Sequence, residues 1–116
     1  MDKTFRIGDF TFRLRCPDAL PIPENFLKFA REGEPEYTYD IALAESLPEP
    51  EGKLVARRED LTVFATATGE ARYIGVKGNP DPYACYRETS PTTARVTLLS
   101  ARAARQILEK EFPEIF

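Results

Sequence analysis

The sequence is divided into short runs in which apolar and polar residues alternate, and groups of turn-forming residues separate these runs. In Phe10 to Cys16, every second side chain is apolar. Successive side chains of a β-strand point to opposite faces, so this alternation predicts a strand with one buried face. Comparable runs predict strands over residues 4–7, 10–16, 36–45, 54–57, 61–66, 71–76, 83–88 and 93–99.

Two short helices are predicted beside these strands. One begins after Pro23 and ends before Gly33, and the other begins after Ser100, a suitable N-cap. The second has an apolar stripe made of Ala104, Ile107, Leu108 and Phe112. No helix is predicted between the strands from residue 54 to residue 99, so for these strands an antiparallel meander is favoured over βαβ units. The predicted class is α+β, mainly antiparallel β: a curved meander sheet, a sandwich or a partly open barrel, with a short helix in the N-terminal half and one C-terminal helix.

Length and charge limit the domain count and the partners. The 116 residues fit a single β-rich domain, 1–116, and the two apolar residues at its end favour excision from a longer protein. Residues 1–50 hold ten acidic and six basic side chains (−4), whereas residues 51–116 hold nine and ten (+1), giving −3 in total. This is far from the basic stripe of nucleic-acid-binding proteins, so no nucleic-acid partner is expected. Neither a signal peptide nor a membrane span is readable, which predicts a cytoplasmic location and no membrane partner.

Several kinds of catalytic and metal site are missing from the sequence. It has no histidine, which excludes Ser-His-Asp and Cys-His arrangements within one chain. Cys16 and Cys85 form no C-x-x-C pair, so no metal site is predicted. We predict two buried free thiols, with a single disulfide as the alternative. The glycine-rich loops that bind phosphates are also absent, and no cofactor is expected.

Arginines recur in the predicted strands and are candidate binding residues: Arg13, Arg15, Arg72, Arg87 and Arg95. If register places several on one face, they form a cationic strip beside Tyr39, Tyr73 or Tyr86, and arginine and tyrosine on a rigid sheet suit recognition. The overall charge balance separately leaves an acidic peptide open as a partner. The alternative is an ordinary solvated face, on which charges prevent edge-to-edge aggregation.

A second candidate site lies inside a curved sheet. Its lining would be Tyr37, Tyr39, Asp40, Tyr83 and Tyr86. Such a mostly apolar site with a few polar groups suits a small molecule, and Asp40 could act as an acid or base if desolvated. The alternative for Asp40 is a solvated, outward-facing carboxylate.

The order of motifs carries a family resemblance. It consists of residues 5–12 (Phe-Arg-Ile-Gly-Asp-Phe-Thr-Phe), a proline-rich bend, residues 26–29 (Phe-Leu-Lys-Phe), and residues 35–37 (Pro-Glu-Tyr) before a long strand. This order resembles the N-terminal region of HPr-kinase-like bacterial proteins. In that family the phosphate-binding loop and the phosphoryl-transfer residues belong to a following domain. The resemblance therefore implies an accessory domain without catalytic residues.

The leading functional hypothesis is a noncatalytic accessory domain that binds a protein or peptide, including β-augmentation at an exposed strand edge. A homo-oligomer through the C-terminal helix is a subsidiary prediction. The alternative is a small-molecule-binding protein or a carboxylate-dependent enzyme with its site inside a curved sheet. Whether the chain is an enzyme is left open, with no catalytic activity in this chain alone as the favoured answer.

Overall fold

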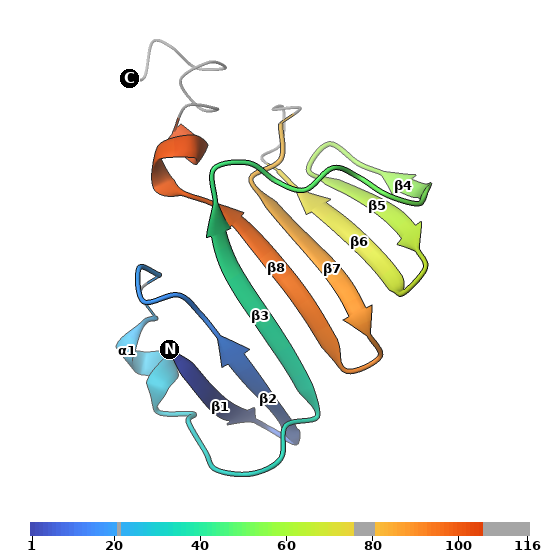
Figure 1. Ribbon diagram of the computed structural model, residues 1–116. Helices are drawn as coiled ribbons and strands as arrows, with labels where there is room; N and C mark the ends of the chain where they lie inside the picture. Colours follow the sequence, from blue (N-terminus) through green and yellow to red (C-terminus); the bar gives the residue numbers. More distant parts are fainter. Residues whose placement is uncertain (21, 76–80, 106–116) are drawn as a thin grey trace.

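A single open sheet of eight strands runs through the molecule (Figure 1). The computed structural model describes residues 1–20, 22–75 and 81–105. Along the sheet the strand order is β1-β2-β3-β8-β7-β6-β5-β4, so β1 and β4 are its edges. The strands are β1 (Asp2–Ile7), β2 (Phe10–Arg15), β3 (Tyr37–Ala44), β4 (Lys53–Arg57), β5 (Leu61–Thr66), β6 (Gly69–Ile74), β7 (Ala84–Ser90) and β8 (Thr93–Leu99). The predicted α+β class is confirmed in its curved-sheet form.

The first two strands form an antiparallel hairpin, as the Gly8-Asp9 pair between two strand-like runs predicts. Gly8 and Asp9 connect β1 to β2, and Gly8 has a φ of 60°, which glycine adopts at little cost. The strands are antiparallel, with Phe5 opposite Phe12. Residues directly opposite each other in paired strands share a face, so these two phenylalanines lie on the same face.

The connection between β2 and β3 is a crossover rather than a hairpin. These strands are parallel, and the chain between them contains the short helix α1 (Glu24–Leu27). A parallel pair needs a crossover of about a dozen residues or more, and residues 16–36 supply it. β3 and β8 are also parallel. The antiparallel meander predicted over residues 54–99 is confirmed as β4 to β8.

Residues 45–52, which we call the strap, connect the end of β3 to β4 at the opposite edge of the sheet. In Figure 1 this segment passes beyond β8, β7, β6 and β5 before the chain turns into β4. Gly52 ends the strap with a φ of 89°. A β-carbon built there would lie 2.0 Å from the carbonyl oxygen of Ala65, so the strap reaches β4 through a position that only glycine fits.

Register divides the side chains between two faces. One, which we call the aromatic face, carries mainly rings and aliphatic groups: Phe5, Phe10, Phe12, Tyr37, Tyr39, Ile41, Val63, Ile74, Tyr86, Val96 and Leu98. The other, which we call the arginine face, carries polar and charged groups together with a few apolar ones: Arg13, Arg15, Asp40, Phe64, Tyr73, Cys85, Arg87, Arg95 and Thr97.

Two small clusters of buried side chains lie on opposite faces. On the aromatic face, Phe26 of α1 packs on Phe5 and Phe12, with ring centroids 4.9 Å and 6.3 Å apart. On the arginine face, Leu47 of the strap and Phe64 pack against a buried cluster whose members are Ala71, Tyr73 and Cys85. Each end of the sheet is therefore covered on one face, and the covered faces differ.

The C-terminal helix begins where the sequence predicts it. Residues 101–105 are helical, and the hydroxyl of Ser100 accepts a hydrogen bond from the Ala103 backbone N–H at 3.2 Å. This confirms Ser100 as the N-cap. Of the predicted apolar stripe, Ile107, Leu108 and Phe112 lie outside the described residues, so oligomerisation through this helix stays a prediction.

The two thiols are free and buried, as predicted. Cys16 follows β2 and Cys85 lies in β7, and three inter-strand steps separate these strands. At about 4.8 Å per step, they lie roughly 14 Å apart, well beyond the reach of a disulfide.

Candidate functional site

Three tyrosines meet on the aromatic face. Tyr37 and Tyr39 belong to β3 and Tyr86 belongs to β7, so the group reaches across β8. The hydroxyls of Tyr37 and Tyr86 are hydrogen-bonded at 3.1 Å, and the rings of Tyr37 and Tyr39 are centred 4.9 Å apart. Ala94 of β8 lies opposite Tyr39 and is 1% exposed. Its small side chain leaves room for the rings to lie over β8.

Arg72 adds a cation to this tyrosine group. Its guanidinium lies 5.4 Å from the centre of the Tyr86 ring and donates to the Glu70 carboxylate at 2.9 Å. Burial, followed by the hydrogen bond with Tyr37, raises the pKa of Tyr86 to about 12. Burial also raises the pKa of Tyr39. Both phenols are therefore neutral at ordinary pH and can donate hydrogen bonds, but they are poor general bases.

Tyrosine and arginine on a rigid sheet form a surface suited to recognition. Such side chains offer a large contact area with few freely rotating bonds, and they are enriched among residues that dominate binding energy. The charged groups beside the tyrosines are Arg72, its partner Glu70, and Glu88, whose charge acts on both Arg72 and Tyr86. Because the Tyr39 and Tyr86 phenols are protonated and are poor general bases, the cluster favours binding over acid–base catalysis.

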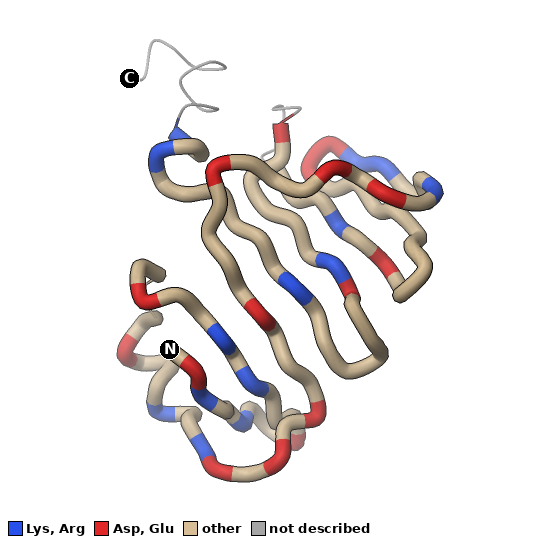
Figure 2. Tube along the Cα trace, viewed as in Figure 1, with Lys and Arg blue, Asp and Glu red and all other residues tan. Residues whose placement is uncertain are grey.

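A row of charges crosses the arginine face. Register places Arg15 opposite Asp40, Asp40 opposite Arg95, and Arg95 opposite Arg87. Figure 2 shows this order as an acidic position on β3 followed by basic positions on β8 and β7. Asp40 is exposed, in agreement with the outward-facing alternative. The cationic strip thus forms in part, and Asp40 interrupts it.

An open groove lies between this row and the strap. Its volume is about 400 Å³, and it is lined by Ser46, Leu47, Pro48, Cys85, Arg87, Arg95 and Thr97. Cys85 is 1% exposed and lies at its floor, where burial raises the pKa of the thiol. The groove combines an apolar wall from the strap with guanidinium and hydroxyl groups from the strands.

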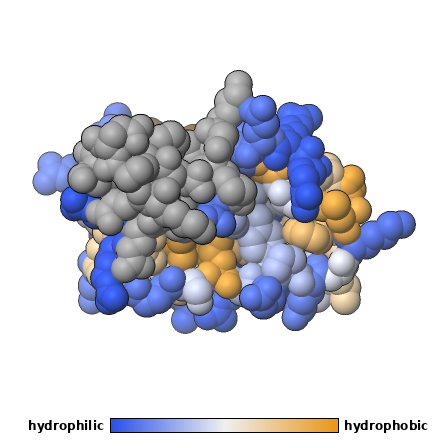
Figure 3. Space-filling view, turned by 90° about the horizontal axis from the view of Figure 1, so that it is seen from above, coloured by the Kyte–Doolittle hydropathy of each residue, from blue (hydrophilic) through white to orange (hydrophobic). Residues whose placement is uncertain are grey.

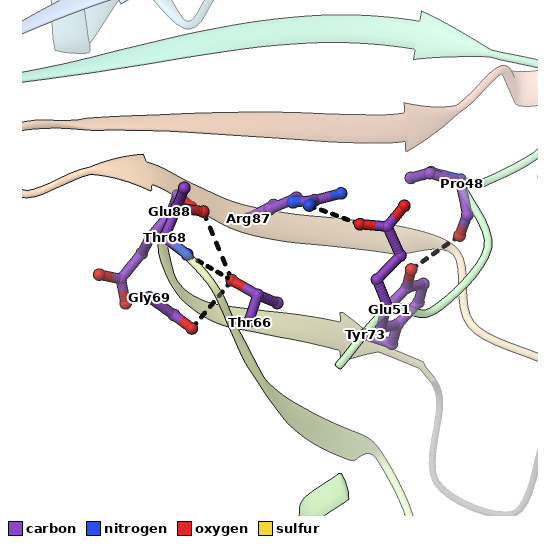
Figure 4. Close-up of polar contacts among 8 residues, drawn as sticks. All are labelled: Pro48, Glu51, Thr66, Thr68, Gly69, Tyr73, Arg87 and Glu88. Carbon is purple, nitrogen blue, oxygen red and sulfur yellow. Dashed lines mark hydrogen bonds and ion pairs between the residues drawn. The ribbon is translucent and has the colours of Figure 1, made fainter. Parts of the chain in front are cut away.

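Two polar contacts hold the strap over the arginine face (Figure 4). The Tyr73 hydroxyl donates to the Pro48 carbonyl oxygen at 2.7 Å, and Nη2 of Arg87 donates to Glu51 at 2.7 Å. Burial raises the pKa of Tyr73, so the donor stays protonated at ordinary pH. Nearby in Figure 4, the Thr68 hydroxyl donates to the Glu88 carbonyl at 2.7 Å and ties the β5–β6 turn to β7.

The predicted site residues are divided between the two faces. Arg72, Tyr37, Tyr39 and Tyr86 lie on the aromatic face, whereas Asp40, Arg87 and Arg95 lie on the arginine face. Tyr83 immediately precedes β7 and is 41% exposed. Arg72 and Arg87 therefore cannot belong to one strip.

The predicted pocket around Asp40 and the tyrosines is not formed. Tyr39 and Asp40 are neighbours in one strand, and neighbours in a strand point to opposite faces. Sequence reasoning also missed the contacts of Pro48 and Glu51 with the sheet. The proline–acid alternation predicts an extended loop, but the strand order decides where that loop lies.

Three further observations concern metal binding, membrane spans and similarity to known proteins. Among the described residues, no group of three or more potential metal-ligating side chains is found. Within the same residues, no helix is both long and apolar enough to cross a membrane. No family model, curated protein or solved structure matches the chain.

Proposed function

We propose that this chain is a noncatalytic accessory domain that binds a protein across its aromatic face. One observation carries the proposal: large apolar side chains of β3 and β5 to β8 remain partly exposed on this face. They include Ile41, Val63, Ile74, Val96 and Leu98. In the described part of the chain, α1 covers the aromatic face at β1 and β2 and makes no ring contact farther along the sheet.

The composition of this surface supports a protein partner. Domains are normally built from at least two packed layers, and an apolar sheet face is stabilised when a second layer covers it. Figure 3 views the molecule from the end of the sheet where β3 and β8 finish, and both apolar and polar residues reach the surface at this end. A partner with apolar side chains would supply the covering layer, and its acceptors could bind the hydroxyls of Tyr37 and Tyr86.

The resemblance to HPr-kinase-like bacterial proteins suggests a source for that layer. In such proteins a catalytic domain follows the β-rich region, and its surface is a natural partner for the aromatic face. Two buried free thiols fit the reducing cytoplasm, where we place the protein.

The alternative, a small-molecule-binding protein or a carboxylate-dependent enzyme, has less support. Asp40 lies on the face opposite Tyr37, Tyr39 and Tyr86, so these groups do not converge on one ligand. An enzyme would need another carboxylate arrangement.

Neighbouring residues of β3 provide a matched test. Ile41→Lys places a charge on the aromatic face, whereas Ala42→Lys places the same charge on the arginine face. The bait is the whole chain, the candidate partner is a kinase-like domain of the resembled family, and binding is followed by calorimetry. We expect Ile41→Lys to abolish binding and Ala42→Lys to retain it.

Folding must be separated from binding in this test. The denaturant midpoint of each variant shows whether it is folded. A double variant, Tyr37→Phe with Tyr86→Phe, keeps both rings but removes both hydroxyls, so it tests whether the hydroxyls contribute to binding. Equal binding by the two lysine variants, with both folded, would reject the aromatic face as the contact surface. A change of mass to that of a dimer would instead identify a second copy as the covering layer.

A further inference from the structure

Arg87 and Arg95 form a like-charged pair on the arginine face. They are directly opposite across the antiparallel strands β7 and β8. Like charges in this position destabilise a sheet unless an anion lies near them. Glu51 forms an ion pair with Arg87, but within the described residues Arg95 forms neither an ion pair nor a side-chain hydrogen bond. The pair thus carries more positive charge than its contacts neutralise.

The neighbouring carboxylate does not remove this imbalance. Asp40 lies opposite Arg95 on the β3 side, yet no ion pair joins the two side chains within the described residues. Arg95 is exposed. Its guanidinium therefore has all of its donors available to an incoming group.

Both arginines line the groove beside the strap. The other lining residues include both polar and apolar side chains. Thr97 and Ser46 contribute hydroxyls, whereas Leu47 and Pro48 contribute an apolar wall. The volume of about 400 Å³ is in the range of small-ligand and side-chain pockets. A fitting ligand has an anionic group next to an apolar one.

The strap itself shows which chemistry these arginines accept. Its Glu51 carboxylate binds Nη2 of Arg87 at 2.7 Å, and its Pro48 carbonyl accepts from Tyr73 at 2.7 Å. Nε and Nη1 of Arg87 are not used by that contact. An acidic, proline-containing segment thus already lies along one side of the groove, and a second carboxylate could bind Arg87 without displacing the first.

We propose that this groove binds an acidic peptide, with one carboxylate held between Arg95 and Arg87 and an adjacent apolar residue against Leu47 and Pro48. Planar carboxylates match guanidinium groups by paired hydrogen bonds. A phosphate is the weaker candidate, because it brings no apolar group to the wall formed by Leu47 and Pro48. This site lies on the face opposite the proposed protein-binding surface and acts independently of it.

The test uses a fluorescently labelled peptide of alternating proline and glutamate, titrated with the whole chain and followed by anisotropy. Arg95→Gln removes a charge-assisted bond, and we expect binding to weaken about tenfold. Arg57→Gln is the matched control, since Arg57 is an exposed strand arginine that does not line the groove. The same peptide with glutamine in place of glutamate should not bind.

Removal of a carboxylate beside the groove should have the opposite effect on peptide binding. Glu51→Gln frees Arg87 from its internal carboxylate, so we expect this variant to bind the peptide several-fold more tightly. Ile41→Lys, which alters the other face, should bind like the unmodified chain. This variant distinguishes failure of the groove from failure of the aromatic face.

Three outcomes would overturn the proposal. The first is equal affinity of Arg95→Gln and Arg57→Gln for the glutamate peptide. The second is equal affinity of the unmodified chain for the glutamate and glutamine peptides, which includes no binding of either. The third is binding of inorganic phosphate at Arg87 and Arg95, mapped by nuclear magnetic resonance, without binding of the peptide, which would identify a phosphate site instead.

Discussion

The two ends of the sheet are covered on opposite faces and by different means. At the β1–β2 end, α1 places the Phe26 ring on Phe5 and covers the aromatic face. At the β5–β7 end, the strap covers the arginine face, anchored by the Tyr73 hydroxyl and by the ion pair of Arg87. One cover is aromatic packing, and the other combines a small apolar cluster with polar anchors.

The sheet, rather than one common core, therefore unites the molecule. Phe5 and Cys85 are its largest fully buried side chains among the described residues, and they lie on opposite faces. Damage to one cover should therefore leave the other cover largely in place. The predictions below test that independence.

Loss of aromatic packing at the β1–β2 end should have the largest effect. Phe5 is 0% exposed and contacts the rings of Phe12 and Phe26. We expect Phe5→Ala to reduce the free energy of unfolding by about 3–5 kcal/mol, measured by urea denaturation. Phe10→Ala, at a ring that is 41% exposed, should cost less than about 2 kcal/mol. Similar losses for both variants would contradict the importance of the α1 cover.

The end of the strap is the next most sensitive position. Gly52→Ala forces a β-carbon against the Ala65 carbonyl at a positive φ, and we expect a loss of about 2 kcal/mol or more. Gly8→Ala is the matched control, because its φ is also positive but nothing lies within 4 Å. It should cost about 1 kcal/mol. A smaller loss at Gly52 than at Gly8 would show that the strap adjusts freely.

Alkaline pH should weaken both ends. The pKa of Tyr86 is raised from 10.0 to about 12, and burial also raises that of Tyr73. The folded state therefore retains protons that the unfolded state loses, so this contribution is complete below pH 10.0 and disappears as pH rises to about 12. For Tyr86 the loss stays below about 2.7 kcal/mol, because the ring is partly exposed.

The urea midpoint, measured together with tyrosinate absorbance, tests this dependence. The urea midpoint of Tyr86→Phe should fall less steeply with rising pH, because the contribution from the aromatic face is removed. The midpoint of Tyr73→Phe should also fall less steeply, because the contribution from the arginine face is removed. A midpoint that stays constant across this pH range would contradict the raised pKa values.

The smallest effect is expected from a single strap anchor. Tyr73→Phe removes the hydrogen bond to Pro48 but keeps the ring, so we expect a loss of about 1 kcal/mol. Tyr83→Phe serves as control at an exposed tyrosine and should change stability by less than about 0.5 kcal/mol. Hydrogen exchange should show faster exchange near the strap in Tyr73→Phe and no change in β1. Faster exchange at both ends would indicate that the two covers are coupled.

Local features of the fold were predictable because neighbouring residues determine them. Alternation located the strands, Gly8 and Asp9 located the first hairpin, and Ser100 located the start of the last helix. The parallel pairing of β3 was not predictable in this way, because it joins segments that are distant in sequence. Nothing near Tyr37 in sequence specifies whether its strand runs with or against β8.

The candidate sites were likewise predictable only where neighbouring residues determine them. Alternation alone places Tyr39 and Asp40 on opposite faces, so the sequence itself argues against a single pocket lined by both residues. The alignment of Arg95 with Arg87 required the register of β7 and β8, which depends on the bulge between Glu88 and Ser90. The contact of Glu51 with Arg87 required the strand order of the whole sheet.

The parallel ladder between β3 and β8 also has a kinetic consequence. It pairs Thr38 with Thr93, so its two strands are separated by 55 residues along the chain. The β4 to β8 meander can form from local contacts, whereas this ladder requires closure of a long loop, which slows folding. During synthesis at about 5–20 residues per second, β3 must wait roughly 3–11 seconds for β8 to be made. For that interval the edge of β3 that pairs with β8 stays unpaired, which prolongs the exposure of its backbone hydrogen-bonding groups.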